Sequence, residues 1–277
     1  MAQPKRKEPE TTPSSPEAVK NTGASTPLAP SAGLSAKGWA LLAGVLLLAN
    51  LPVIHRFVLR GDQPAPVAIP FADAFTEAGT VETNYWSTGG HWRVVNGQLL
   101  SPGVKNNPLW LKAKLPRDVV VEFDARSESP EGDIKVEIFG DGLNHASGYI
   151  LIHGGWNNSV SIIARLDEHG EPLGRLEQKA RQIAQEQSLP KADVVATGVF
   201  KKDTQMRVEA APFPVQVGRT YRWRLERKGS TLRWLIDGQP FMSFDDPFPL
   251  EGDEHNRFGF SSWEAQLYFD NLSIQPL

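Results

Sequence analysis

The sequence predicts an all-β fold of antiparallel strands, and three observations carry this prediction. Strand-like runs with alternating side chains recur at short intervals from about residue 70 onward. Turn pairs such as Asn96-Gly97 and Asp237-Gly238 separate several of these runs, and such pairs supply the two positive φ values that a type I′ hairpin turn needs. Helices do not alternate regularly with the strands, so a sandwich or barrel is favoured over a β-α-β fold.

The stretch that begins at Thr220 shows the alternation most clearly. In TYRWRLE the apolar side chains share one face, while Arg222, Arg224 and Glu226 share the other, and TLRWLI repeats the pattern after a Lys228-Gly229 turn. This alternation predicts antiparallel strands with one buried face and one wet face. The residues predicted to face inward are Tyr221, Trp223, Leu225, Leu232, Trp234 and Ile236.

The N-terminal region differs from the rest in composition. Residues 1–36 are dominated by Pro, Ser, Thr, Ala and charged residues, so we expect a disordered cytoplasmic tail. Residues 38–54 carry no charge and lie at the short end of what spans a bilayer. We therefore expect a transmembrane signal anchor over residues 37–59. A cleavable signal peptide is the alternative, but the preceding segment is long for one and only Leu47-Leu48-Ala49 offers a weak cleavage site.

The charges that flank this segment predict its orientation. More Lys and Arg residues precede it than follow it, which favours a cytoplasmic N-terminus and an extracytoplasmic C-terminal domain. The expected location is therefore the cytoplasmic (inner) membrane, crossed once. A Pro-containing linker over residues 60–69 leads to the folded domain, residues 70–277.

One segment inside this domain has helical periodicity. Apolar residues recur at helical spacing from Leu173 to Ala184, and Pro190 follows as a stop. We expect a short amphipathic helix near residues 173–188, inserted between strands and lying against one side of the sandwich. It would act either as a lid over a binding face or as a surface brace.

Composition excludes some function classes. The formal net charge is −3 and no basic stripe stands out, which disfavours nucleic acid as a partner. The absence of cysteine excludes disulfides and thiolate zinc sites. Eight tryptophans suit a large β core, and tryptophan also forms the flat platforms on which sugar rings stack.

With its strands in this order, the region 70–277 resembles the concanavalin A-like lectin/glucanase jelly rolls. It looks most like the bacterial 3-keto-disaccharide hydrolase-like group, and more distantly like laminin-G-type modules. The resemblance rests on FADAF (71–75), HWRVVNGQLLS, DVVVEFDARS, the Thr220 hairpin and the closing FGFSSW…LYFDNLSI. It implies an antiparallel jelly-roll sandwich with a carbohydrate or another envelope ligand as partner. The fold hosts lectins, hydrolases, lyases and adhesion modules.

Two sets of acidic residues are candidates for catalysis or metal binding. Family-16 glycoside hydrolases of this superfamily carry Glu-x-Asp-x-x-Glu on a strand. Glu122 and Asp124 match its first two carboxylates, whereas Ser127 stands at the third position, so a charge-balanced strand face is the alternative. In such jelly rolls a calcium ion often lies between the first and last strands. Asp73 and Asp270 are its candidate ligands here, or else they cap a turn and a bulge.

The candidate ligand-binding residues lie in two loops that combine tryptophan with polar side chains. They are His153, Trp156, Asn157, Asn158, Trp263 and Glu264. Gly154 and Gly155 would let a ligand approach, the tryptophans would stack on a sugar ring, and the amides would bond to hydroxyls. Alternatively, the glycines make a wide hairpin and both tryptophans close the edge of the core.

The expected function is a membrane-anchored, extracytoplasmic, lectin-like protein that binds carbohydrate. A glycoside hydrolase or lyase acting on envelope or environmental glycans is the first alternative. A non-sugar adhesion or protein-interaction module is the second.

Overall fold

The computed structural model describes residues 33–54, 67–190 and 195–277. The chain divides into two compact units, residues 1–61 and residues 62–277. Most of the predicted disordered tail, residues 1–32, and most of the predicted linker, residues 60–66, lie outside the described residues.

Helix α1 (Ala36–Ile54) coincides with most of the predicted membrane span. Its apolar run is interrupted at Asn50, whose side chain donates a hydrogen bond to the Leu46 carbonyl over 2.8 Å. Within the described ranges, no helix combines the length and the apolar character needed to cross a membrane. The prediction of a transmembrane helix over residues 37–59 is therefore not supported, and residues 55–59 lie outside the described residues.

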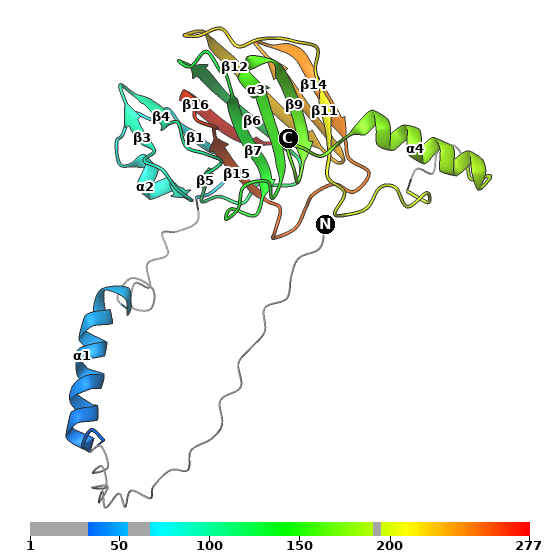
Figure 1. Cartoon of the computed structure of the whole chain (residues 1–277). Coiled ribbons are helices and arrows are strands. Elements are labelled where there is room, and N and C mark those ends of the chain that lie inside the picture. The colour runs from blue at the N-terminus through cyan, green and yellow to red at the C-terminus, as the bar shows by residue number, and fades with distance from the viewer. Residues whose placement is uncertain (1–32, 55–66, 191–194) are drawn as a thin grey trace, which may run out of the picture. The chain divides into compact units, whose positions relative to one another are not determined.

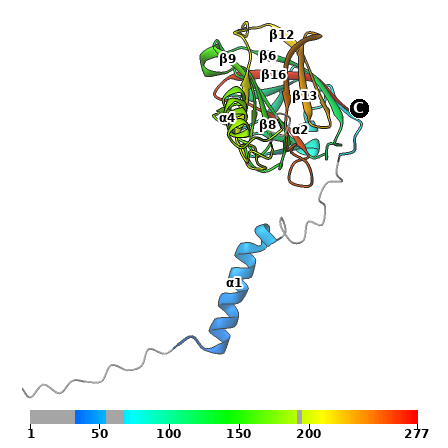
Figure 2. The same cartoon turned by 90° about the vertical axis from the view of Figure 1, so that its right-hand side faces the viewer.

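The second unit is a sandwich of two eight-stranded sheets (Figures 1 and 2). Sheet A has the order β14-β13-β12-β6-β16-β4-β3, and β1 also pairs with β16. Every pairing in sheet A is antiparallel. Its strands are β1 (Phe71–Asp73), β3 (Arg93–Val95), β4 (Gln98–Pro102), β6 (Val119–Ser127), β12 (Thr220–Lys228), β13 (Thr231–Ile236), β14 (Gln239–Asp245) and β16 (Gln266–Pro276).

Sheet B has the order β10-β11-β9-β8-β7-β15-β5-β2. All of its pairings are antiparallel except that of β10 with β11. Its strands are β2 (Tyr85–Ser87), β5 (Leu109–Leu111), β7 (Ile134–Gly140), β8 (Tyr149–Gly154), β9 (Val160–Arg165), β10 (Glu171–Pro172), β11 (Met206–Glu209) and β15 (Arg257–Ser261). Helix α2 (Thr80–Asn84) and the one-turn α3 (Gly155–Asn158) are short.

The core lies between the two sheets. Phe123 of β6 contacts Phe258 and Phe260 of β15 across the sandwich, with ring centroids 5.9 and 5.6 Å apart. Trp223 and Trp234 pack against each other within it, 4.2 Å apart. These contacts confirm the all-β antiparallel sandwich predicted from alternation.

The predicted hairpins are also confirmed. Along β12 Tyr221, Trp223 and Leu225 are buried, whereas Arg222, Arg224 and Glu226 are partly exposed, as the alternation requires. Arg227 departs from the pattern of charge, because it lies on the inner face and is 1% exposed. Both Asn96 and Gly97, and both Asp237 and Gly238, have positive φ, which a type I′ turn requires.

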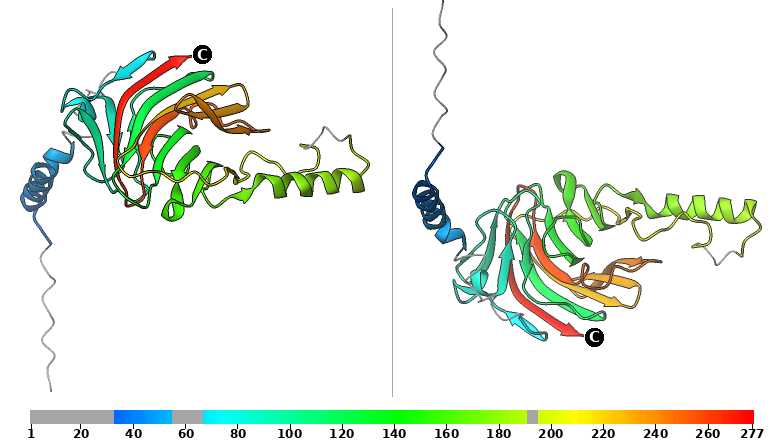
Figure 3. Two further views of the ribbon diagram at one scale, coloured as in Figure 1. Left: turned by 90° about the horizontal axis from the view of Figure 1, so that it is seen from above. Right: turned by 90° about the horizontal axis from the view of Figure 1, so that it is seen from below.

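The predicted helical insert is α4 (Leu173–Glu186). It follows β10 and contacts the edge strand β10 and its neighbour β11. In Figures 1 and 3 it extends away from the sandwich. Leu173, Leu176 and Ala180 pack with the core cluster, so the helix is held at the edge of sheet B, but it does not cover either sheet as a lid.

Candidate functional site

Strand β7 directs charged side chains to the outer face of sheet B. Ile134 and Val136 enter the core between the sheets, so Lys135 and Glu137 point the other way. An outer strand face is normally wet, yet Lys135 is 1% exposed and Glu137 is 0% exposed. Buried charges need partners, and these come from loops that lie over this face.

The same face is apolar on the neighbouring strands. Ile150 and Ile152 of β8 form a second buried cluster with Ile162 and Ala164 of β9. The 166–170 loop lies at this face, because Arg207, beside Ala164 in register, donates to the Gly170 carbonyl over 2.7 Å. The loop thus brings Glu168 to the charged residues of β7.

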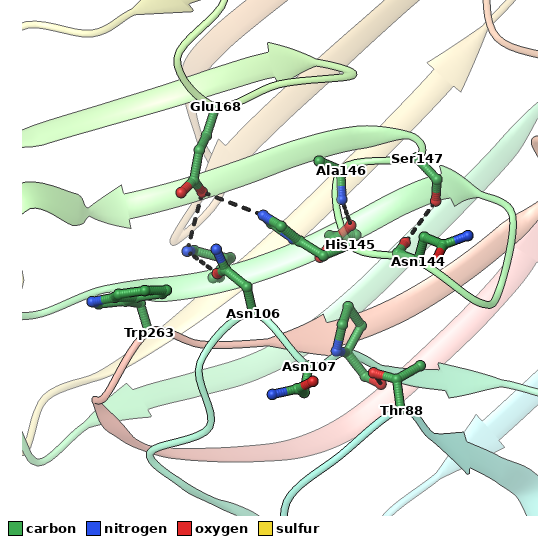
Figure 4. A network of polar contacts seen from close by, with 12 residues as sticks. Thr88, Asn106, Asn107, Asn144, His145, Ala146, Ser147, Glu168 and Trp263 are labelled. Carbon is green, nitrogen blue, oxygen red and sulfur yellow. Dashed lines mark hydrogen bonds and ion pairs between the residues drawn. The ribbon is translucent and has the colours of Figure 1, made fainter. Parts of the chain in front are cut away.

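Lys135 is the centre of a polar network, of which Figure 4 labels Asn106, His145 and Glu168. Its ammonium group bonds to Asn106 Oδ1 at 2.9 Å and to Glu168 Oε2 at 3.2 Å, and Asp133 Oδ2 lies at 3.8 Å. One buried cation is therefore shared by two carboxylates and an amide from three different segments. We call Asp133, Lys135, Glu137, His145 and Glu168 the polar cluster.

Glu137 holds His145 in place. Its Oε1 lies 2.7 Å from His145 Nδ1, and its Oε2 accepts from the Ala146 N–H over 3.0 Å. The other ring nitrogen, Nε2, lies 3.9 Å from Glu168 Oε2. A buried carboxylate thus orients an imidazole whose opposite edge faces a second carboxylate.

Asp133 links the polar cluster to the two tryptophan loops. Its N–H donates to the Gly154 carbonyl over 2.9 Å, at the start of the Trp156 loop. Its Oδ2 accepts from the Trp263 N–H at 2.5 Å. Burial raises the pKa of Asp133 to about 6, although Lys135 and the Trp263 N–H both act to lower it.

Beside Lys135 lies Ser261, its register partner on β15 and therefore a residue of the same face. Ser261 is 0% exposed, and its hydroxyl has no hydrogen-bond partner in the part of the chain that the structure describes. A buried hydroxyl without a partner is uncommon in proteins. The Ser261 hydroxyl therefore marks a place on this face where a hydrogen-bonding partner is missing.

The predicted Trp156 loop is partly exposed and partly a structural turn. Trp156, Asn157 and Asn158 all have positive φ. Trp156 is 42% exposed, and its ring packs edge-on against His169 of the 166–170 loop at 5.6 Å. The Asn158 side-chain amide instead donates to the Val215 carbonyl and accepts from the Val215 N–H, each at 2.7 Å. Both ends of this amide are therefore hydrogen-bonded within the protein.

Trp263 and Glu264 lie in the second predicted loop. Trp263 is 47% exposed, and the Lys105 ammonium lies 5.9 Å from its ring centroid. Glu264 forms an ion pair with the same ammonium group. Because Asp133 contacts both loops, the structure brings the two predicted tryptophans to the same end of sheet B.

His153, one of the predicted ligand-binding residues, lies in the core and not on the surface. It shares the inner face of β8 with Tyr149 and Leu151, is 0% exposed, and stacks on Phe213 at 5.1 Å. Burial lowers its pKa to about 4, so the ring is neutral at physiological pH. It is a core residue, because the strand alternation that places it with Tyr149 also points it between the sheets.

Asp73 and Asp270 do not fit one calcium site. Asp73 turns toward sheet B, where it accepts hydrogen bonds from Thr80 at 2.6 Å and Tyr85 at 3.1 Å. Asp270 pairs in register with Asp124 on the outer face of sheet A, and a bulge at Asn271 separates it from Leu272, the partner of Asp73. Among the described residues, no group of three or more His, Cys, Asp or Glu side chains is placed to hold a metal ion.

Glu122 and Asp124 lie on the outer face of sheet A, where each forms an ion pair with an arginine. Asp124 Oδ1 lies 3.3 Å from Arg222, and Glu122 Oε1 lies 3.2 Å from Arg224. Their side chains are 31% and 25% exposed. This arrangement is the charge-balanced face that the sequence offered as the alternative to catalysis.

The sequence interpretation did not select Lys135, Glu137, His145 or Glu168. A usable signal was present in YILIHG and VSIIARL, which lack the polar residues of a wet face. Strands that are apolar on both faces are covered on both faces. The neighbouring DIKVE therefore had to bury its charges as well.

No protein-family model matches the chain, and no curated protein matches it in sequence. Solved structures do match. The carbohydrate-binding module CBM66 from Bacillus subtilis is 13% identical with a TM-score of 0.47, covering 69% of this chain and 95% of that one. A Bacillus subtilis protein of unknown function with a galectin-like fold is 13% identical, with a TM-score of 0.45 and coverages of 74% and 94%.

A third match is the carbohydrate recognition domain of Emp47p, 10% identical with a TM-score of 0.43 and coverages of 78% and 99%. At such low identities and TM-scores, these matches transfer no function to this chain. What the chain shows by itself is an antiparallel β-sandwich with a covered, charged outer face.

Proposed function

We propose that residues 70–277 bind carbohydrate at the outer face of sheet B, as a lectin-like domain. The observation that carries the proposal is the pairing of two half-exposed tryptophans with the polar cluster. Trp156 and Trp263 are 42% and 47% exposed. The Trp263 N–H bonds to the Asp133 carboxylate, and the Trp156 ring packs against His169, the residue after Glu168. A sugar needs an apolar platform for its ring face and fixed polar groups for its hydroxyls, and this surface offers both.

A third tryptophan extends the surface toward the sheet edge. Trp86 of β2 is 53% exposed and lies in register with Trp110 of β5. Trp110 in turn pairs with Gly259 of β15, the strand that ends at Ser261. Exposed aromatic side chains along one face suit a ligand of several sugar units.

The test is a glycan array probed with the full-length chain, with and without a chelator. We expect binding to a limited set of glycans, and loss of that binding in Trp263→Ala. A calcium requirement, which the positions of Asp73 and Asp270 do not favour, would appear as a loss of binding in the chelator arm. Binding to no glycan would refute the proposal and would favour the protein-interaction module instead.

A second candidate function is supported by the Glu137–His145 pair. An imidazole held by a buried carboxylate is the arrangement of a general base with its orienting group. This pair favours a glycoside hydrolase or lyase as the enzyme alternative, with His145 rather than Glu122 or Asp124 as its first candidate. Product release from a glycan panel, abolished by His145→Gln, would support it.

The extracytoplasmic location of this domain stays a prediction. It rests on the Lys and Arg residues that precede residue 38. A reporter enzyme fused after Leu277 tests it, because activity restricted to the cytoplasm would contradict it.

A further inference from the structure

The surface around the two tryptophans carries more carboxylates than cations. With histidines counted as neutral, two lysines face four carboxylates. The lysines are Lys105 and Lys135, and the carboxylates are Asp133, Glu137, Glu168 and Glu264. Burial raises the pKa of Asp133 and the Glu168 carboxylate adds to this rise, while Lys135 offsets it only in part. A cation brought by a ligand would relieve this imbalance.

Glu168 has one oxygen turned away from Lys135. Its Oε2 is the atom that contacts Lys135 and His145, at 3.2 and 3.9 Å. Its Oε1 has the exposed His169 ring at 3.9 Å, which is beyond hydrogen-bond distance. The side chain is 14% exposed, against 10% for Asp133 and 0% for Glu137, so among the carboxylates of the polar cluster this oxygen is the position that a ligand reaches most directly.

A buried hydroxyl beside the polar cluster is a second, independent observation, because it lacks a hydrogen-bonding partner. The Ser261 hydroxyl is fully buried on this face, next to Lys135, and has no partner among the described residues. A ligand hydroxyl or a bridging water would satisfy it.

The protein itself places an ammonium group on this surface. Lys105 Nζ lies 5.9 Å from the Trp263 ring centroid and pairs with the Glu264 carboxylate. An ammonium group between an aromatic face and a carboxylate is favourable. The Lys105 side chain is 61% exposed, so a ligand amine can compete for the same surroundings.

We propose that the ligand of this site is a hexosamine unit with a free, protonated amino group, with its ring on Trp263 and its ammonium group toward Glu168. This inference rests on the proposed carbohydrate binding and narrows it to one class of sugar. An N-acetylated sugar lacks the charge, and a neutral hexose lacks the nitrogen altogether.

Titration calorimetry on the full-length chain tests the proposal with three tetrasaccharides. These are the β-1,4-linked tetramers of glucosamine, of N-acetylglucosamine and of glucose. We expect the glucosamine tetramer to bind at least about tenfold more tightly than the other two. Equal or tighter binding of the neutral tetramers would overturn the amine preference and leave carbohydrate binding intact. Binding of none of the three, together with an empty glycan array, would overturn both.

Two further arms separate this site from general attraction to an acidic protein. Glu168→Gln is expected to reduce the ratio of glucosamine to N-acetylglucosamine affinity to within about threefold, and a ratio does not depend on the fraction of folded protein. The matched control is Glu177→Gln on α4, where Glu177 forms an exposed ion pair with Arg181; it should keep the full ratio. An unchanged ratio in Glu168→Gln, or spermidine binding as tightly as the glucosamine tetramer, would contradict the proposal.

Discussion

The outer faces of the two sheets both carry paired charged residues, but loops cover these residues on sheet B and leave them open to solvent on sheet A. On sheet A, Arg224 contacts Glu122 at 3.2 Å and Glu226 at 2.7 Å, and its side chain is 37% exposed. On sheet B, Lys135 contacts Glu168 at 3.2 Å, and its side chain is 2% exposed. Both are strand residues paired with carboxylates. The loops that cross sheet B turn an ordinary charged face into a buried cluster.

This difference changes what each charge does. In water, paired surface charges contribute little to stability, so the sheet A network mainly keeps that face soluble. A buried charge is costly to leave unpaired, so the cluster on sheet B fixes the loops that carry Trp156 and Trp263. Three experiments test this contrast, and a fourth tests the titration of two buried groups, Asp133 and His153.

The largest effect is expected from removing one cation from each face. Lys135→Met leaves Asp133 and Glu168 without their shared ammonium group and should lower the free energy of unfolding by roughly 3–5 kcal/mol. Arg224→Met on sheet A should lower it by less than about 1 kcal/mol. Urea denaturation of both variants at pH 7 measures this, and similar losses would refute the contrast.

The second experiment separates two pH effects that oppose each other. Asp133 has a pKa of about 6 when folded and 3.8 as its reference, so its contribution to stability is complete below pH 3.8 and is lost as pH rises through 6. His153 has a pKa of about 4 when folded and 6.5 as its reference, so the folded state gains stability as pH rises from 4 to 6.5. Each effect amounts to roughly 3 kcal/mol.

Because the two effects have opposite signs, the wild-type protein should show little change between pH 4 and 6.5. Asp133→Asn should reveal the histidine contribution as a rise of roughly 3 kcal/mol over that range. Adding His153→Phe should flatten the curve again. Urea unfolding at several pH values measures all three proteins, and a flat curve for Asp133→Asn alone would show that these assignments are wrong.

The third experiment compares an aromatic residue from each outer face in ligand binding. Trp263→Ala should weaken binding of any array-positive glycan by about tenfold or more, because it removes a ring from the proposed platform. Tyr268→Ala is the matched change on sheet A, where that ring packs with the Arg126 guanidinium 4.6 Å from its centroid. Calorimetry with the same glycan should show no change for it. Equal losses would place the site elsewhere.

The sandwich could be predicted because it depends on local patterns. Alternation identified the buried side of β12 and β13, and Asp237-Gly238 identified the turn from β13 to β14. The position of α4 followed from its periodicity. The direction in which α4 leaves the sandwich could not be predicted, because helical spacing shows which residues form the apolar face and does not show what that face packs against.

The candidate site could be predicted only in part. Trp156 and Trp263 were found because tryptophan next to polar residues in a loop is a usable signal. His145 and Glu168 were missed because each lies in a loop, His145 directly after β7 and Glu168 after β9, and the folding of a loop back over a sheet follows no sequence period. His153 was wrongly included because alternation alone does not say which face of an isolated strand is buried.

The smallest effect is expected from salt, and it bears directly on the contrast between the faces. At 1 M NaCl the screening length falls to about 3 Å, so exposed pairs such as Arg224–Glu122 lose most of their attraction while buried pairs are screened much less. The stability difference between wild type and Arg224→Met should shrink by a few tenths of a kcal/mol. The difference for Lys135→Met should stay nearly constant, because its carboxylate partners remain shielded from the added ions by the loops. Urea denaturation in low and high salt measures both differences. An equal salt response of the two variants would mean that solvent reaches the polar cluster as freely as it reaches sheet A, and the loops would then be open in solution.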